Sequence, residues 1–167
     1  ENGSLYCLDN NLNLTRVDTN YIIANGPAFI DFKNFFHADS RKKIIYKIKI
    51  DKGLNIKRKK IFKRFSKNDG SPDGMTIDKF NNLWVCHFGG ACISVFNKKG
   101  KKIHKIKFPV KNITNCAFGG TKNNYLYITS ALKGLKNSDI KKSNLSGCLF
   151  RVKTNIKGNI CKSYGGF

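Results

Sequence analysis

Acidic residues and methionine are scarce in this sequence. Ten of its 167 residues are Asp or Glu, whereas 32 are Lys or Arg, which gives a formal net charge of +22. The single glutamate is Glu1, and the single methionine is Met75. Because a natural chain normally begins with methionine, we expect this sequence to be a fragment, a processed product or an incomplete gene model.

Long apolar runs are also missing. No stretch approaches the roughly 18–20 apolar residues of a membrane-spanning helix, and the start has no basic segment followed by an apolar one. Apolar residues nevertheless make up 40% of the chain and are spread along it, which indicates one folded domain over residues 1–167. We expect a cytoplasmic protein without a membrane partner.

Arginine is scarce although the chain is strongly basic. Such a charge usually indicates a nucleic-acid or anionic-membrane partner. However, 27 of the cationic residues are Lys and five are Arg, the residue that suits phosphate forks and base edges. The lysines fall in turns and at alternating strand positions, where solvated surface belongs. A compositional bias is the preferred interpretation, with no specific nucleic-acid partner; salt-sensitive binding to unrelated nucleic acid is the alternative.

Paired cysteine motifs are absent. The six cysteines contain no CxxC pair, and no histidine follows at zinc-finger spacing. Most stand among apolar residues in strand-like segments, which indicates buried free thiols in a reducing compartment; a disulfide framework is the alternative. The six are Cys7, Cys86, Cys92, Cys116, Cys148 and Cys161.

A repeat of short strands replaces the helical periodicity, which is nearly absent. Three strand–turn–strand units align with one another; they begin at Asn25, Asp73 and Asn115, at intervals of 48 (25 to 73) and 42 (73 to 115) residues. A third strand recurs at 4–8, 44–48, 92–96 and 148–152, and a fourth at 59–63 and 102–106. A period of about 40–50 residues with four strands is typical of β-propeller blades.

The predicted fold is therefore all-β, a partial six-bladed β-propeller. Two nearly complete blades span 25–65 and 73–108, a third opens at 115 and closes through 147–152, and the tail of an earlier blade covers 3–18. Six such blades need roughly 250–300 residues, so the chain supplies about half to two-thirds of them. The polar segment 132–146 is expected to be a binding loop or a plain connector, with one helical turn around 139–142.

Side-chain oxygens recur where each inner strand begins. The innermost strands of a propeller start near its central channel, so Asn25, Asp73 and, more loosely, Asn115 should converge there. Oxygen donors from separate blades suit a hard cation such as Ca²⁺ or Mg²⁺, or Zn²⁺ or Mn²⁺ where fewer donors leave an open position. The alternative is that Asn25 and Asp73 merely cap the tight turns before Gly26 and Gly74.

Several ordered motifs resemble those of the SMP-30/gluconolactonase (regucalcin-like) family. Residues 72–78 (PDGMTID) with 83–85 (LWV) are similar to the family signature PDG-(M/L)-x-(I/V)-D…LWVA. Residues 115–120 with 126–130 are similar to the family's S-C-x-F-G-G…LYVTSA. Segments 3–6, 24–26, 38–40 and 147–150 match further family elements in the expected order, so the resemblance to the C-terminal portion of the family covers essentially the whole chain.

The resemblance implies a site and a reaction. Asn25 and Asp73 match two of the family's metal ligands, and Asp73 is also a candidate general base for the attacking water. The implied activity is metal-dependent hydrolysis of a sugar lactone to its aldonic acid, with the cation acting as a Lewis acid. The family's metal-binding Glu and its substrate-binding Arg and Asn lie upstream of this sequence. A non-catalytic calcium-binding propeller, or an inactive fragment, is the alternative.

Two further residues are candidates for contact with substrate, namely His87 and Asn115. No G-x-S-x-G motif is present, so we expect no serine-hydrolase chemistry. Trp84 is expected to pack between blades, and Asp78 is expected to fix a turn rather than to bind a ligand. A partial propeller leaves two inter-blade faces unpaired, so we expect self-association or a partner that supplies the missing blades.

Overall fold

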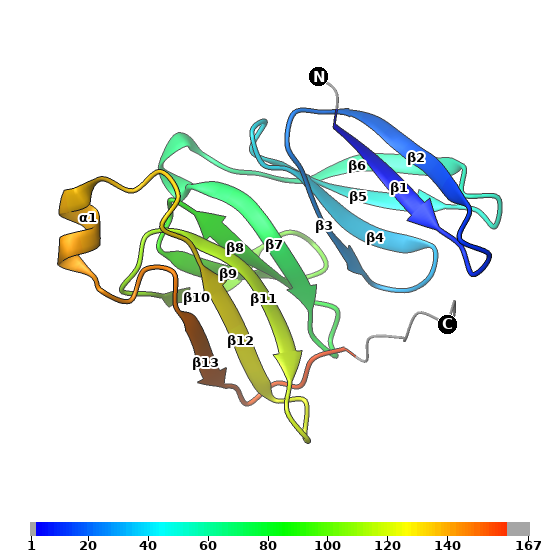
Figure 1. The fold of residues 1–167 in the computed structure, drawn as a ribbon. Coiled ribbons are helices and arrows are strands. Elements are labelled where there is room, and N and C mark those ends of the chain that lie inside the picture. Colours follow the sequence, from blue (N-terminus) through cyan, green and yellow to red (C-terminus); the bar gives the residue numbers. More distant parts are fainter. Residues whose placement is uncertain (1–2, 160–167) are drawn as a thin grey trace.

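The computed structural model describes residues 3–159. Its strands form four antiparallel sheets, each built from strands that follow one another in the sequence (Figure 1). A leading hairpin (β1–β2) precedes two four-stranded blades (β3–β6 and β7–β10) and a final three-stranded blade (β11–β13). The predicted all-β partial propeller is confirmed, and so is the division of the chain into blades.

The element bounds follow the predicted repeat closely. The elements are β1 (Gly3–Leu8), β2 (Leu14–Tyr21), β3 (Ala24–Phe29), β4 (Asn34–Asp39), β5 (Ile44–Ile50), β6 (Ile56–Arg64), the 3₁₀ turn Lys67–Asp69, β7 (Ser71–Ile77), β8 (Leu83–Phe88), β9 (Cys92–Phe96), β10 (Lys102–Lys107), β11 (Ile113–Gly119), β12 (Tyr125–Ser130), α1 (Asn137–Lys142) and β13 (Leu149–Lys153). No helix within residues 3–159 is both long and apolar enough to cross a bilayer.

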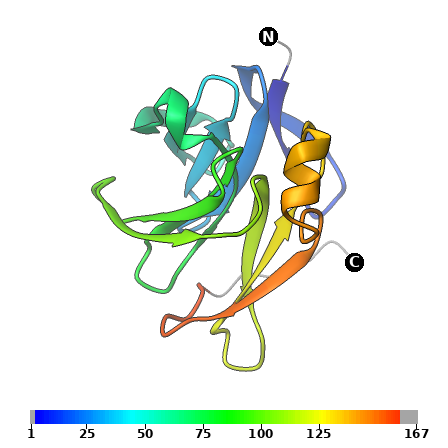
Figure 2. The same ribbon diagram turned by 90° about the vertical axis from the view of Figure 1, so that its left-hand side faces the viewer.

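The core lies between successive blades, because each sheet buries one face against the next (Figure 2). Between the two full blades, Phe36 and Ile45 pack with Val85. Between the second full blade and the final one, Trp84 packs with Leu126, and its ring meets Phe118 edge-on at 5.2 Å. Trp84 therefore lies in an inter-blade core, as predicted.

The segment between β12 and β13 contains the expected helical turn. It is α1, slightly longer than the predicted 139–142, and the segment is tied back to the final blade by an ion pair between Lys111 and Asp139, with Nζ and Oδ2 3.3 Å apart. Because β12 runs antiparallel to β11, this segment lies at the end of the molecule where β11 begins. It therefore borders the end that carries the inner-strand starts.

The described cysteines are all free thiols. Cys86, Cys92 and Cys116 are buried, as predicted, and Cys7 is half-buried. Cys148 is exposed, which corrects the expectation drawn from its apolar neighbours: β13 begins one residue later, so Cys148 belongs to the preceding turn. Cys161 lies outside the described residues, as does Glu1.

His37 is buried without a hydrogen-bond partner. It lies on β4 with 2% of its surface exposed, its two ring nitrogens have no partner within the described residues, and the Tyr21 ring meets it edge-on at 4.6 Å. Burial lowers the pKa of His37 from 6.5 to about 4, against smaller opposing effects of Asp18 and Asp39 and a reinforcing one of Lys59.

We expect His37 to make stability depend on pH. Below pH 6.5 the His37 imidazole is protonated in the unfolded chain, whereas in the folded chain it stays neutral down to about pH 4. The free energy of unfolding should therefore fall by about 3 kcal/mol as the pH falls through this window. Urea unfolding between pH 7 and 4.5 measures the slope. His37→Phe should remove most of it, leaving the part due to His87, whose pKa burial also lowers. A slope that persists in His37→Phe would contradict the assignment.

Candidate metal centre

The three inner strands share an irregularity at the positions predicted for the site. In each of them the register against the neighbouring strand shifts. The shift lies next to Asn25 in β3, across Asp73 in β7 and next to Asn115 in β11. A bulge of this kind re-aims a side chain and is common beside functional sites. β3 and β11 both pack against β7, so the fold brings the three positions to neighbouring places on the inner strands.

The structure places Asn25 and Asp73 in direct contact. The Asn25 amide nitrogen donates a short hydrogen bond to the Asp73 carboxylate, and the Asn25 amide oxygen accepts one from the Gly26 N–H at 3.0 Å. Ser40 lies beside them, with its Oγ 3.4 Å from the Asn25 amide nitrogen. Both predicted ligands therefore meet at one point, although they come from different blades. Ser40 was not predicted for the site; its only signal was its place in the family-like segment 38–40.

Asp73 is a half-buried carboxylate without a cationic partner. Among residues 3–159 no Lys or Arg lies within ion-pairing distance of it, whereas Asp18, Asp51 and Asp139 each pair with a lysine. Burial raises its pKa, although hydrogen bonds from Asn25 and from the Gly74 N–H oppose that shift. A carboxylate that the fold desolvates and leaves without an ion pair among the described residues is a candidate functional group.

Asn115 packs onto the same site from the other side. A Cβ at Gly74 would lie 2.1 Å from the Asn115 Oδ1 atom and 2.8 Å from its Cα, so only glycine allows this approach. The Asn115 Oδ1 atom accepts a hydrogen bond from the Cys116 N–H at 2.8 Å. Asn115 is itself exposed, which keeps it available to a ligand.

His87 lies apart from this contact. It pairs in register with Pro72, is 2% exposed, and its Nδ1 atom is 2.6 Å from the Asp69 carbonyl oxygen. Its Nε2 atom has no hydrogen-bond partner within the described residues. No hydrogen bond joins His87 to Asn25 or Asp73 in that part of the chain, so a substrate contact by His87 stays a prediction.

The described residues supply only part of a cation's coordination shell. Nowhere in 3–159 do three or more His, Cys, Asp or Glu residues gather as metal ligands would. The Asp73 carboxylate and the Asn25 amide are hard oxygen donors from two blades, which suits two positions around Ca²⁺, Mg²⁺ or Mn²⁺. The donors present therefore fit a divalent cation as a partial site.

The sequence profile of the SMP-30/Gluconolactonase/LRE-like region matches residues 1–132. The chain belongs to this family. Among its relatives, regucalcin of Danio rerio is 32% identical over 169 residues, which cover 98% of this chain and 57% of regucalcin. An uncharacterised protein of Sulfolobus acidocaldarius is 36% identical over 132 residues, which cover 77% of this chain and 48% of that protein.

Solved structures of the family share the fold. A luciferin-regenerating enzyme superposes with a TM-score of 0.82 at 33% identity, covering 93% of this chain and 53% of its own. A regucalcin of Agrobacterium tumefaciens, described as a calcium-binding protein, gives a TM-score of 0.89 at 21% identity over 96% of this chain and 55% of its own. A gluconolactonase of Xanthomonas campestris gives a TM-score of 0.69 at 23% identity, over 93% of this chain and 44% of its own. At these last two identities the likeness concerns the fold alone.

The chain spans about half the length of the curated relatives it matches. Within this SMP-30/gluconolactonase half, the inner strands carry Asn25, Asp73 and Asn115 at equivalent positions. Among residues 3–159, no group of three or more His, Cys, Asp or Glu side chains completes this site.

Proposed function

We propose that this chain supplies metal-binding blades of a gluconolactonase-type lactone hydrolase, in which Asn25 and Asp73 hold a divalent cation. The observation that carries the proposal is the contact between the Asn25 amide and a half-buried Asp73 carboxylate, which forms no ion pair with a lysine or arginine among residues 3–159. Membership of a family that includes proteins called gluconolactonase supports the substrate class, a sugar lactone.

In this proposal, Asp73 has two roles. Its carboxylate binds the cation together with the Asn25 amide oxygen, and it is placed to accept a proton from the attacking water. Burial raises its pKa, which makes it a stronger base than an exposed aspartate. Asn25 orients that carboxylate through their hydrogen bond. Asn115 is exposed and adjacent to Gly74, which supports a contact between Asn115 and the lactone. A bound cation would supply Lewis-acid polarisation of the lactone carbonyl.

A non-catalytic calcium-binding role is the second candidate. One observation favours it: residues 3–159 supply two oxygen ligands but no third acidic, histidine or cysteine ligand near them. Such a site would bind a cation weakly and leave most of its coordination shell to water, which suits a binding protein as well as an enzyme.

The two candidates differ in turnover. We expect the purified chain to hydrolyse a sugar δ-lactone, measured by acid release, and to lose this activity in EDTA. Adding back Ca²⁺, Zn²⁺, Mg²⁺ and Mn²⁺ separately identifies the cation. Calorimetric cation binding without hydrolysis would favour the calcium-binding role. Hydrolysis that EDTA leaves unchanged would contradict a metal-dependent mechanism.

The unpaired faces at both ends of the array are proposed as association surfaces. On the leading hairpin, Leu8 and Leu14 are exposed, and on β13 Leu149 is 66% exposed. In a closed propeller, both faces would pack against further blades. Association with a second copy, or with blades supplied by a partner, therefore stays a prediction for the chain.

A further inference from the structure

A second face of the molecule lies opposite the candidate metal centre. The arrowheads of β3, β7 and β11 point to one end in Figure 1, whereas the metal-centre residues lie near the starts of these strands. Six tight turns gather at that end, and we call this surface the turn face. They are residues 9–13, 30–33, 51–55, 78–82, 97–101 and 120–124.

The turn aspartates accept hydrogen bonds from backbone N–H groups of their own turns. The Asp31 Oδ1 atom accepts N–H bonds from Lys33 and Asn34, both 2.8 Å long. Asp9, Asp51 and Asp78 accept bonds from backbone N–H groups of their turns in the same way. An Asx turn of this kind points the intervening residues toward solvent. The tips of these turns are therefore the outermost part of the face.

Apolar side chains occupy several of these tips. Phe32 is 71% exposed, and Leu12 and Phe80 are each 56% exposed, although turn tips are ordinarily polar. They come from three different turns, so no single local packing defect explains them. Apolar tips on several turns of one face make that face a candidate interaction surface.

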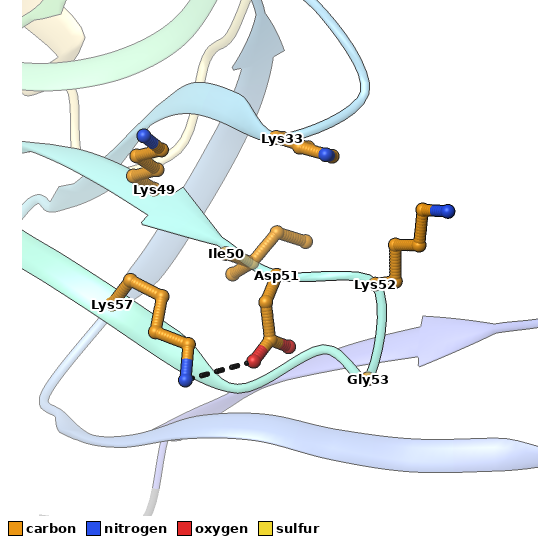
Figure 3. A pocket seen from close by; sticks show the side chains of 7 residues that line it. All are labelled: Lys33, Lys49, Ile50, Asp51, Lys52, Gly53 and Lys57. Atoms are coloured by element: carbon orange, nitrogen blue, oxygen red, sulfur yellow. Dashed lines mark ion pairs between the residues drawn. The ribbon is translucent and has the colours of Figure 1, made fainter.

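Lysines surround these tips. A hollow of about 410 Å³ between two of the turns is lined by Lys33, Lys49, Lys52 and Lys57 (Figure 3). Lys57 reaches the Asp51 carboxylate at 3.0 Å, whereas the ammonium groups of the other three point away from it. Exposed lysines continue across the neighbouring turns at positions 79, 98, 99, 101 and 122. The turn face is therefore strongly cationic.

We propose that the turn face docks on an anionic lipid bilayer, with Leu12, Phe32 and Phe80 inserted at the headgroup level and the surrounding lysines over acidic headgroups. This proposal departs from the expectation, drawn from the sequence alone, of no membrane partner. Apolar tips partition into the interface, and lysines near the surface are attracted by anionic lipid, so the two effects add. Lysine is suited to this place because its stem packs on apolar surface while its ammonium group stays in water.

A nucleic acid fits the same face less well. Single-stranded nucleic acid stacks its bases on aromatic rings that share a continuous platform, whereas the tips here stand on separate turns and include the aliphatic Leu12. The turns themselves contain no arginine, the residue that binds phosphate bidentately and reads guanine, and Arg58, beside them, pairs in register with Lys49. Docking of this face on a bilayer leaves the metal centre, at the other end of the inner strands, open to water.

Co-sedimentation of the full chain with vesicles tests this proposal. At about 0.15 M salt, we expect binding to phosphatidylcholine vesicles that contain roughly 30% phosphatidylserine and little binding to phosphatidylcholine alone. Phe32→Ser with Phe80→Ser should lower the affinity at least about tenfold, because both side chains leave the interface. These two residues are exposed, so both variants should fold, which urea unfolding verifies.

Charge variants provide the matched control. Lys33→Gln, Lys52→Gln and Lys79→Gln, combined, should lower vesicle affinity at least about tenfold. The same change at three exposed lysines away from the turn face, Lys67, Lys107 and Lys133, should have a much smaller effect. Equal loss in the two triple variants would reduce the binding to overall charge and overturn the proposal. Unchanged binding in the phenylalanine variant would overturn it too, as would binding of single-stranded RNA by a chain that ignores the vesicles.

Discussion

Replacing Asp73 with Asn is expected to lower the affinity of the chain for divalent cations at least about a hundredfold. The substitution removes the carboxylate charge, which supplies most of the attraction for a hard cation. It keeps the size of the side chain, and its amide oxygen can still accept the bond from Asn25. Isothermal titration calorimetry with Ca²⁺ and Mn²⁺ measures the loss, and lactone hydrolysis should disappear with it.

The same substitution should not destabilise the fold. Burial raises the pKa of Asp73, so the folded state disfavours the ionised carboxylate relative to the unfolded chain. At neutral pH this carboxylate therefore lowers stability, and its neutral amide should leave the free energy of unfolding unchanged or raise it. Lost cation binding without lost stability is characteristic of a functional residue.

Asp69→Asn is the matched control for Asp73→Asn. It removes one negative charge near the same end of the molecule, where the Asp69 carboxylate accepts hydrogen bonds from the Ser66 N–H and hydroxyl. The two carboxylates differ in their pKa shifts. Burial raises the pKa of Asp73, whereas the hydrogen bonds from Ser66 lower the pKa of Asp69. Asp69→Asn should therefore keep cation binding and lose some stability. An equal loss of cation affinity in both variants would mean that any negative charge in this region attracts the cation, and would contradict direct binding by Asp73.

The blades could be predicted from the sequence because each repeats the same local signals. Turn residues such as Asn81-Asn82 and Asn123-Asn124 recur at matching distances from the starts of the inner strands, and each blade is one hairpin array with few long connections. The meeting of Asn25 and Asp73 could be predicted for the same reason: equivalent strand positions converge in a propeller. Cys148 was misplaced because apolar neighbours do not reveal where a strand begins.

Other features of the site depend on pairings that no repeat reveals. The bulges beside Asn25 and Asp73 are shifts between two strands, and a pattern of alternating residues in one strand does not specify them. The isolation of His37 depends on which side chains the leading hairpin presents to β4, and the exposure of Phe32 and Phe80 depends on the Asx turns around them. These features follow from tertiary contacts.

The turn role of Asp78 could be predicted from the sequence, whereas its bond to Trp84 could not. Its replacement should have the largest effect on stability. Its fully buried carboxylate accepts bonds from the Phe80 and Asn82 N–H groups at 2.9 Å, as the predicted turn requires. It also accepts one from the Asn82 side chain and, unpredicted, one from the Trp84 indole N–H at 3.0 Å. Because Trp84 packs between blades, this bond joins the turn to the inter-blade core.

Asp78→Ala should therefore lower the free energy of unfolding by about 3 kcal/mol, since it leaves the buried indole N–H and two turn N–H groups without an acceptor. Urea unfolding followed by fluorescence measures it, because Trp84 is the single tryptophan. Asp31→Ala is the control: Asp31 holds the equivalent turn of the preceding blade but is exposed and bonds no indole, so its loss should cost about 1 kcal/mol. Equal losses would assign the effect of Asp78 to its turn alone, and would contradict a role for the indole bond in joining that turn to the inter-blade core.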